Sequence, residues 1–159
     1  MARVKLDYSQ VVFCYSTTMD VRFDDINIGY HLGNDRLVSL LGEARSRFLE
    51  SRGLSELGSP GVIVSDLVVQ YKAEGRLRDR LRFDIGIADP NRYGGDIVYR
   101  VVREAHDQAT ASAATGGSAP AHEAEPKETI IALAKTGIVF YDYQQARVCS
   151  APDAFFVQS

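Results

Sequence analysis

Apolar and polar residues alternate along the first part of the chain, between Val11 and Phe23. The more apolar positions of this alternation are Phe13, Tyr15, Thr17, Met19, Val21 and Phe23. Because successive side chains of a strand point to opposite faces, a repeat of two residues gathers these positions on one face. The pattern predicts a long first strand whose other face is more polar and exposed to solvent.

The repeat changes to a helical one after residue 34. Its apolar positions recur at steps of four, three and four, at Leu37, Leu41, Ala44 and Phe48. This spacing follows one side of an α-helix and predicts about four to five helical turns. We expect Asn34 or Asp35 to cap the start of the helix through a side-chain oxygen, and Gly53 to end it.

Four further segments have the composition of strands, at residues 62–71, 80–88, 96–104 and 129–142. Residues 107–128 are instead rich in Ala, Gly, Ser, Thr and Glu, without an aromatic residue or a periodic apolar face. This composition predicts a flexible loop. One strand, one long helix and four antiparallel strands together predict a single α+β domain over residues 1–159, with the helix packed on the sheet.

Composition excludes several classes of partner. The formal net charge is −3, which gives no general attraction to nucleic acid or to an anionic membrane. Cys14 and Cys149 lie far apart without a C-x-x-C spacing, so we expect two small buried side chains rather than a disulfide or a zinc site. No apolar run approaches the roughly 20 residues that span a bilayer, and the N-terminal residues lack an apolar signal region. A cytoplasmic location is therefore expected.

Several chemical motifs are absent from the sequence. It contains no G-x-S-x-G, G-x-G-x-x-G or G-x-x-x-x-G-K-[ST] stretch, the motifs of serine hydrolases, dinucleotide-binding proteins and P-loop proteins. The three histidines, His31, His106 and His122, are too scattered to predict a metal cluster. Asp25 and Asn27 begin like a calcium loop, but Gly29 and Arg36 occupy positions where that loop needs oxygen ligands.

The stretch FDDINIGYHLGND, residues 23–35, gathers acids, amides and a histidine directly before the predicted helix. From spacing alone, such a stretch is most simply a polar turn that leads into a helix cap. A functional site is the alternative, and other parts of the chain favour it.

Arg22, Asp25, Asn27, His31 and Asn34 precede the helical stretch GEARSRFLESRGL, residues 42–54. Together with VVQYKAEGRLRDRL, residues 68–81, and ALAKTGIVFYDY, residues 132–143, this order resembles the hotdog-fold acyl-CoA thioesterases. The branch it resembles contains 4-hydroxybenzoyl-CoA thioesterase. That branch shows an Arg-x-x-Asp-x-Asp-x-x-Gly-His type of stretch, then an Asn before the helix and Glu-Ala-Arg-x-x-Phe within it.

The resemblance implies a hotdog fold, in which an antiparallel β-sheet wraps a long central helix. It further implies active sites formed across the interface of a homodimer, with frequent pairing of dimers into a homotetramer. The implied reaction is hydrolysis of an acyl-CoA or acyl-carrier thioester to a free acid and a thiol. No metal or other cofactor is implied.

The resemblance assigns the backbone N–H near Asn34 to the oxyanion of the reaction, which suits the unpaired amides at a helix start. The family places its catalytic Asp at the position of Asn27, and an amide cannot act as a carboxylate base or nucleophile. A hydrolase must then use another group. The candidates are Asp25, His31 and Glu43. The position of Asp25 is more often structural in the family, and His31 has a pKa suited to a base. Related hotdog lineages use a carboxylate on the helix, as Glu43 would be, but Glu43 can instead pair with Arg47.

Five cationic side chains in connecting turns are candidates for binding the CoA phosphates, since guanidinium and ammonium groups match phosphate oxygens. They are Lys72, Arg76, Arg78, Arg80 and Arg92.

Two other functions stay open. Hotdog hydratases and dehydratases of 3-hydroxyacyl or enoyl thioesters use an Asp-x-Asn-Pro-x-His stretch, which Asp25, Asn27 and His31 approach. Here Ile28 replaces the proline and the histidine comes one residue late. The third possibility is a non-catalytic acyl-CoA-binding protein that has lost the acid at residue 27.

Overall fold

The computed structural model describes residues 4–105 and 128–157. In chain order its elements are β1 (Phe13–Asp20), η1 (Phe23–Asp25), α1 (Asn34–Ser51), β2 (Gly61–Tyr71), β3 (Arg80–Asn91), β4 (Gly94–Arg103), β5 (Thr129–Asp142), β6 (Arg147–Val148) and η2 (Asp153–Phe156). Apart from Glu128, the predicted flexible loop at 107–128 lies outside the described residues.

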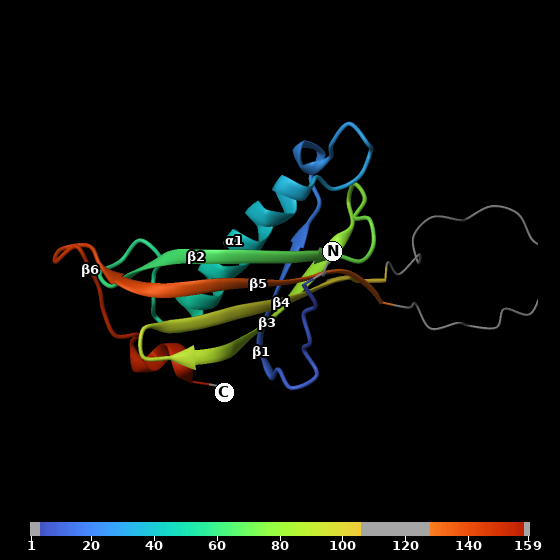
Figure 1. The fold of residues 1–159 in the computed structure, drawn as a ribbon. Coiled ribbons are helices and arrows are strands. Elements are labelled where there is room, and N and C mark those ends of the chain that lie inside the picture. The colour runs from blue at the N-terminus through green and yellow to red at the C-terminus, as the bar shows by residue number, and fades with distance from the viewer. Residues whose placement is uncertain (1–3, 106–127, 158–159) are drawn as a thin grey trace, which may run out of the picture.

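The strands form one antiparallel sheet in the order β1-β3-β4-β5-β2, and the short β6 pairs with β5. Figure 1 shows α1 lying across one face of this twisted sheet. The structure thus confirms a long helix on an antiparallel sheet. Among the described residues, no helix combines the length and apolar character that crossing a bilayer requires.

The predicted apolar stripe of the helix forms the centre of the core. Leu37, Leu41, Ala44 and Phe48 are at most 1% exposed. The alternation along β3 likewise places its apolar side chains in the core, since Leu81, Phe83 and Ile85 are fully buried. Burying one large apolar side chain contributes about 1.5–3 kcal/mol relative to leaving it in water, so these facing stripes fix α1 on the sheet.

The two ends of α1 differ from each other in how well the sequence predicts them. A cap by Asn34 or Asp35 is wrong, because the residue at the N-cap is Gly33 and no side chain caps the helix. The predicted end is confirmed: Gly53 has φ of +70°, a conformation that costs glycine little. Its N–H donates to the Glu50 carbonyl at 2.9 Å, and the Leu54 N–H donates to the Leu49 carbonyl at 2.9 Å.

The first strand is shorter than its sequence pattern predicts. It runs from Phe13 to Asp20, and the chain then enters η1 at Phe23. The other four predicted strands are confirmed, with β3 and β4 extended toward each other by a tight connection at residues 92–93.

Candidate active site

Residues 26–32 fold into a tight turn directly before α1. The Asn27 N–H donates to the His31 carbonyl at 2.9 Å, and the Tyr30 N–H donates to the Asn27 carbonyl at 3.0 Å. Ile26 and Leu32 form an antiparallel bridge at the base of this turn. The polar segment singled out in the sequence is thus a folded turn, and it leaves His31 next to the helix start.

A second segment, the connection between β2 and β3, packs against this turn. The Leu32 N–H donates to the Gly75 carbonyl at 2.8 Å. Gly75 is buried, and a Cβ atom there would lie only 3.1 Å from the Leu32 side chain. The close approach therefore leaves little room for a side chain at residue 75, and Tyr71 at the end of β2 lines the same pocket as His31.

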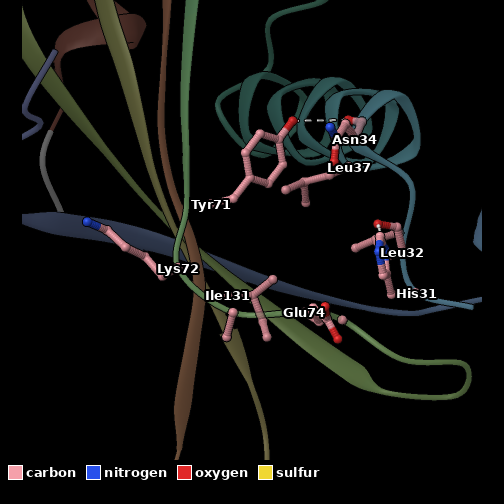
Figure 2. A pocket seen from close by; sticks show the side chains of 10 residues that line it. His31, Leu32, Asn34, Leu37, Tyr71, Lys72, Glu74 and Ile131 are labelled. Carbon is pink, nitrogen blue, oxygen red and sulfur yellow. Dashed lines mark hydrogen bonds between the residues drawn. The ribbon is translucent and has the colours of Figure 1, made fainter. Parts of the chain in front are cut away.

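A pocket of about 260 Å³ opens where the turn, the β2–β3 connection and the start of α1 meet. Figure 2 shows its lining side chains. The predicted site residues that line it are His31, Asn34 and Lys72. The lining residues that the sequence did not single out as site residues are Leu32, Leu37, Tyr71, Ala73, Glu74, Gly75 and Ile131.

The start of α1 supplies hydrogen-bond donors to this pocket. The first helical bond runs from the Leu37 N–H to the Gly33 carbonyl at 2.9 Å. The Gly33 N–H donates to the Asp25 carbonyl at 2.9 Å, whereas the amides of Asn34, Asp35 and Arg36 meet no acceptor among the described residues. Unpaired amides and the positive end of the helix dipole favour an oxygen that gains negative charge.

Tyr71, at the end of β2, lies across the pocket from the helix start. Its hydroxyl donates to the Asn34 carbonyl at 3.4 Å, the contact dashed in Figure 2. Burial raises the pKa of the Tyr71 phenol, and the charge of Asp35 raises it further. Tyr71 therefore stays protonated at neutral pH and remains a donor.

His31 is half-buried at the edge of the pocket. Its Nδ1 lies 3.4 Å from the Leu32 carbonyl oxygen. When Nδ1 carries the proton, it faces this carbonyl and Nε2 holds the lone pair of a base. Nε2 is close to Gly29, since a Cβ atom on that residue would lie 2.9 Å from it.

Glu74 is the one acidic side chain among the described residues that line the pocket. It follows Lys72 on the β2–β3 connection and is exposed, and Figure 2 places its carboxylate on the same side of the pocket as His31. Sequence reasoning missed Glu74, because a single acid in a charged turn has no distinguishing pattern.

Asn27 and Asp25 lie outside the lining of this pocket. The Asn27 Oδ1 accepts the Gly29 N–H at 2.9 Å, so this amide stabilises the turn. Asp25 is 1% exposed, and its carboxylate accepts the Arg22 N–H at 2.8 Å and two guanidinium bonds at 3.2 Å. Burial alone would raise the pKa of the Asp25 carboxyl, but the bonds from Arg22 hold it below its ordinary value.

Glu43 faces a different groove. This groove, of about 600 Å³, lies between α1 and β1 and includes Ser39 and Arg47. Arg47 donates to the Glu43 carboxylate at 2.7 Å and reaches the Thr17 hydroxyl at 3.1 Å. The structure does not bring Glu43 together with His31, and the i,i+4 pair explains its position.

The five predicted phosphate-binding cations do not form one cluster. Lys72 lines the pocket, and Figure 2 shows its ammonium group directed away from His31. Arg78 and Arg80 line a separate depression beside Arg22, and Arg80 pairs with Glu104 at 3.2 Å. Arg76 is exposed on the same β2–β3 connection.

Arg92 lies far from the other four cations. It follows the far end of β3, and a strand of this length separates it from Arg80 by roughly 35 Å. Its guanidinium lies 5.5 Å from the centre of the Tyr93 ring and donates to the Ser150 hydroxyl at 3.2 Å. Arg92 therefore ties the β3–β4 turn to the C-terminal segment.

Within residues 4–105 and 128–157, no three His, Cys, Asp or Glu side chains gather closely enough to hold a metal ion. The polar groups of the pocket are hydrogen-bond donors, one imidazole and one carboxylate.

A long helix packed on a single antiparallel sheet is the arrangement of the hotdog class of α+β proteins. Residues 21–158 match the thioesterase-like superfamily, and the chain belongs to this family. No match was found among curated protein sequences.

Solved structures share this fold at low sequence identity. A gentisyl-coenzyme A thioesterase is 16% identical with a TM-score of 0.68, and the match covers 90% of this chain and 100% of that chain. A 1,4-dihydroxy-2-naphthoyl-CoA thioesterase from Synechocystis is 14% identical with a TM-score of 0.65, over 88% and 90% of the two chains. An Asp-to-Asn mutant of 4-hydroxybenzoyl CoA thioesterase, complexed with 4-hydroxybenzoyl CoA, is 15% identical with a TM-score of 0.68, over 89% and 94%.

Proposed function

We propose that this protein hydrolyses an acyl-CoA or acyl-carrier thioester to the free acid and the thiol. The observation that carries the proposal is the pocket at the start of α1, whose lining includes the first helical residue, His31 and Glu74. Thioester hydrolysis needs donors for the oxygen that becomes negative and a base that activates water. The family and the CoA thioesterases among the structural neighbours support the same reaction.

In the proposed reaction the thioester carbonyl lies at the amides of Asn34 and Asp35, while the Tyr71 hydroxyl donates to the Asn34 carbonyl. Water loses a proton to His31 or Glu74 and adds to the carbonyl carbon. The tetrahedral oxyanion is stabilised by the amides and the helix dipole. When it collapses, the carbon–sulfur bond breaks, and the thiolate receives the proton.

Asn27 directs the mechanism toward an activated water. An amide forms no acyl-enzyme intermediate and accepts no proton at neutral pH. Asp25 cannot replace it without giving up Arg22, so we assign Asp25 a positioning role. Glu74 is the proposed carboxylate of the site, and its charge assists His31 in taking the proton.

For the carrier we favour CoA, which the named structural neighbours act on. Lys72, Arg76 and Arg78 form no ion pair with any described carboxylate, so these three cations are the proposed partners of the CoA phosphates. A cytoplasmic location, expected from the sequence, stays a prediction.

We also propose that the protein is a homodimer, which can pair further into a homotetramer. β2 is an 11-residue edge strand, and Ile63, Val64 and Leu67 on it are 37–45% exposed. Long apolar edge strands are normally covered. A second copy of the chain, paired along β2, would cover this edge.

The function is tested by incubating the purified protein with a panel of acyl-CoA thioesters and measuring free thiol. We expect turnover with at least one of them, and a loss of kcat of at least tenfold in His31→Gln and Glu74→Gln. Glu43→Gln is the matched control, because Glu43 lies in the other groove, and it should retain activity. Binding without thiol release would show a non-catalytic protein, and hydration of an enoyl-CoA would show a lyase.

A further inference from the structure

The backbone around Glu74 is held by hydrogen bonds on both sides. Before it, the Ala73 N–H donates to the Ile131 carbonyl at 3.2 Å. After it, the Gly75 carbonyl accepts the Leu32 N–H at 2.8 Å. The proposed carboxylate of the site therefore lies on a connection that is bonded both to β5 and to the turn before α1.

Arg103, the last residue of β4, makes a third contact with this connection. Its Nη1 donates to the Glu74 carbonyl at 3.1 Å and to the Asp79 carboxylate at 3.2 Å. The same carboxylate accepts the Arg76 N–H at 2.8 Å, and the Asp79 N–H donates to the Arg76 carbonyl at 3.1 Å. One guanidinium thus joins the part of the connection that carries Glu74 to its far end.

The far end of the connection is itself fixed to the core. The Val21 N–H donates to the Asp79 carbonyl, and the Arg78 N–H donates to the Val21 carbonyl, both at 2.9 Å. Val21 is 2% exposed, and the side chains of Arg103 and Asp79 are 28% and 16% exposed. Fully exposed ion pairs contribute little, whereas a shielded pair with further charge-assisted hydrogen bonds is stronger. Arg103 therefore ties the Glu74 backbone to a firmly held part of the fold.

We propose that Arg103 is a positioning residue, which keeps Glu74 at the pocket on the side of His31. Arg103 does not line the pocket, so it acts on the reaction only through the connection. Small displacements of a catalytic group cost rate steeply, which gives this contact an effect on turnover. The inference rests on the proposed function, because it assigns Glu74 the role given there.

The test measures thiol release by variants of Arg103. Arg103→Met, whose side chain has a similar length but no donor, should lower kcat at least tenfold and change KM less than threefold. Both bonds start from one nitrogen, so the single ammonium group of Arg103→Lys can make them and should restore kcat to within threefold of the wild type. Arg100→Met is the matched control on the same strand. Arg100 pairs with Asp84 of β3 at 2.9 Å, and its loss should leave kcat within threefold.

A double-mutant cycle shows whether Arg103 acts through Glu74. In Glu74→Gln the carboxylate that Arg103 positions is already lost, so adding Arg103→Met should lower kcat less than twofold further. Asp79→Asn keeps an acceptor for the Arg76 N–H but removes the charge beside Arg103, and it should lower kcat at least threefold. If Arg103→Met does not fold, Asp79→Asn takes its place in the cycle. Full kcat in the folded variant, or an equal loss with and without the Glu74 carboxylate, would overturn the proposal.

Hydrogen exchange separates this inference from the proposed reaction, because it needs no turnover. Arg103→Met should speed exchange of the Leu32 and Arg76 amides at least tenfold, while the amides of β3 stay protected. If the wild type hydrolyses no thioester but these two amides respond, Arg103 fixes the connection and the hydrolase proposal fails. If the wild type is active and both amides exchange equally fast in Arg103→Met, the hydrolase stands and the role of Arg103 fails.

Discussion

Asp25 and Asn27 are two residues apart, and the fold itself uses both side chains. Asn27 closes the turn through the Gly29 N–H, and Asp25 holds Arg22 on one side while its carbonyl holds the Gly33 N–H on the other. Neither side chain lines the pocket. At the scale of single residues, Asp25 and Asn27 therefore stabilise the turn before α1. His31 and Glu74 supply the reactive groups of the proposed site.

The Asp25 carboxylate should make the free energy of unfolding depend on pH. Asp25→Asn should lower the free energy of unfolding by about 1.5–3 kcal/mol at neutral pH, because a buried carboxylate loses its charge-assisted bonds. The folded pKa of Asp25 lies below its ordinary value of 3.8, so this stabilisation is present above about pH 4 and is lost as the pH falls through the folded pKa. Urea unfolding of both proteins across this range measures the difference.

Asp24→Asn is the control for that measurement, since Asp24 is an exposed neighbour in the same turn. A stability difference between wild type and Asp25→Asn that stays constant from pH 7 to pH 2 would contradict the role given to Asp25.

At the scale of elements, the pocket joins two neighbouring segments, the turn at 26–32 and the start of α1, to a segment distant in sequence, the connection after β2. Local periodicity predicted α1 and the five long strands, because burial of one face determines each of them separately. It did not predict Glu74 as a site residue, because Glu74 and His31 come to line one pocket only in the folded chain, where Leu32 contacts Gly75. The cap was missed for a similar reason, since the Gly33 amide is held by the carbonyl of Asp25, the last residue of η1.

Gly75→Ala should damage the site through this contact. The added methyl group would lie 3.1 Å from the Leu32 side chain and would push the connection away from the turn. We expect thioester turnover to fall at least tenfold, because small displacements of catalytic groups cost rate steeply, with about 1–3 kcal/mol lost from the free energy of unfolding. Thiol release and thermal unfolding measure the two effects.

Gly58→Ala provides the comparison, since a methyl group there makes only contacts of 3.4 Å or more. If Gly75→Ala retained full activity, the close approach of the two segments would not be needed for catalysis.

At the scale of the whole molecule, β2 is a long apolar edge strand that the described residues leave partly exposed. Val64 and Leu67 of β2 line a small cavity against α1, and both are partly exposed in the single chain. The resemblance predicted subunit pairing, and the exposed edge gives that prediction a physical basis in this chain. A single sequence contains no direct signal for which edge is covered, because strand order depends on contacts between distant segments.

Val64→Lys should shift the protein toward monomers, because a lysine on an edge strand opposes pairing with another strand. Sedimentation velocity should show loss of the dimer at micromolar concentration. Turnover should fall at least tenfold if the site needs the second subunit. Leu57→Lys, at a 96% exposed loop position, should leave the assembly unchanged. A monomeric wild-type protein with full activity would refute the dimer proposal.

The Leu32–Gly75 hydrogen bond has a further consequence for how the site opens. It joins the turn that carries His31 to the connection that carries Glu74, and both Leu32 and Gly75 line the pocket. A local opening that breaks this bond would release both groups in one event. The rate of hydrogen exchange at the Leu32 amide would then report how often the whole site comes apart, while the sheet behind it stays protected.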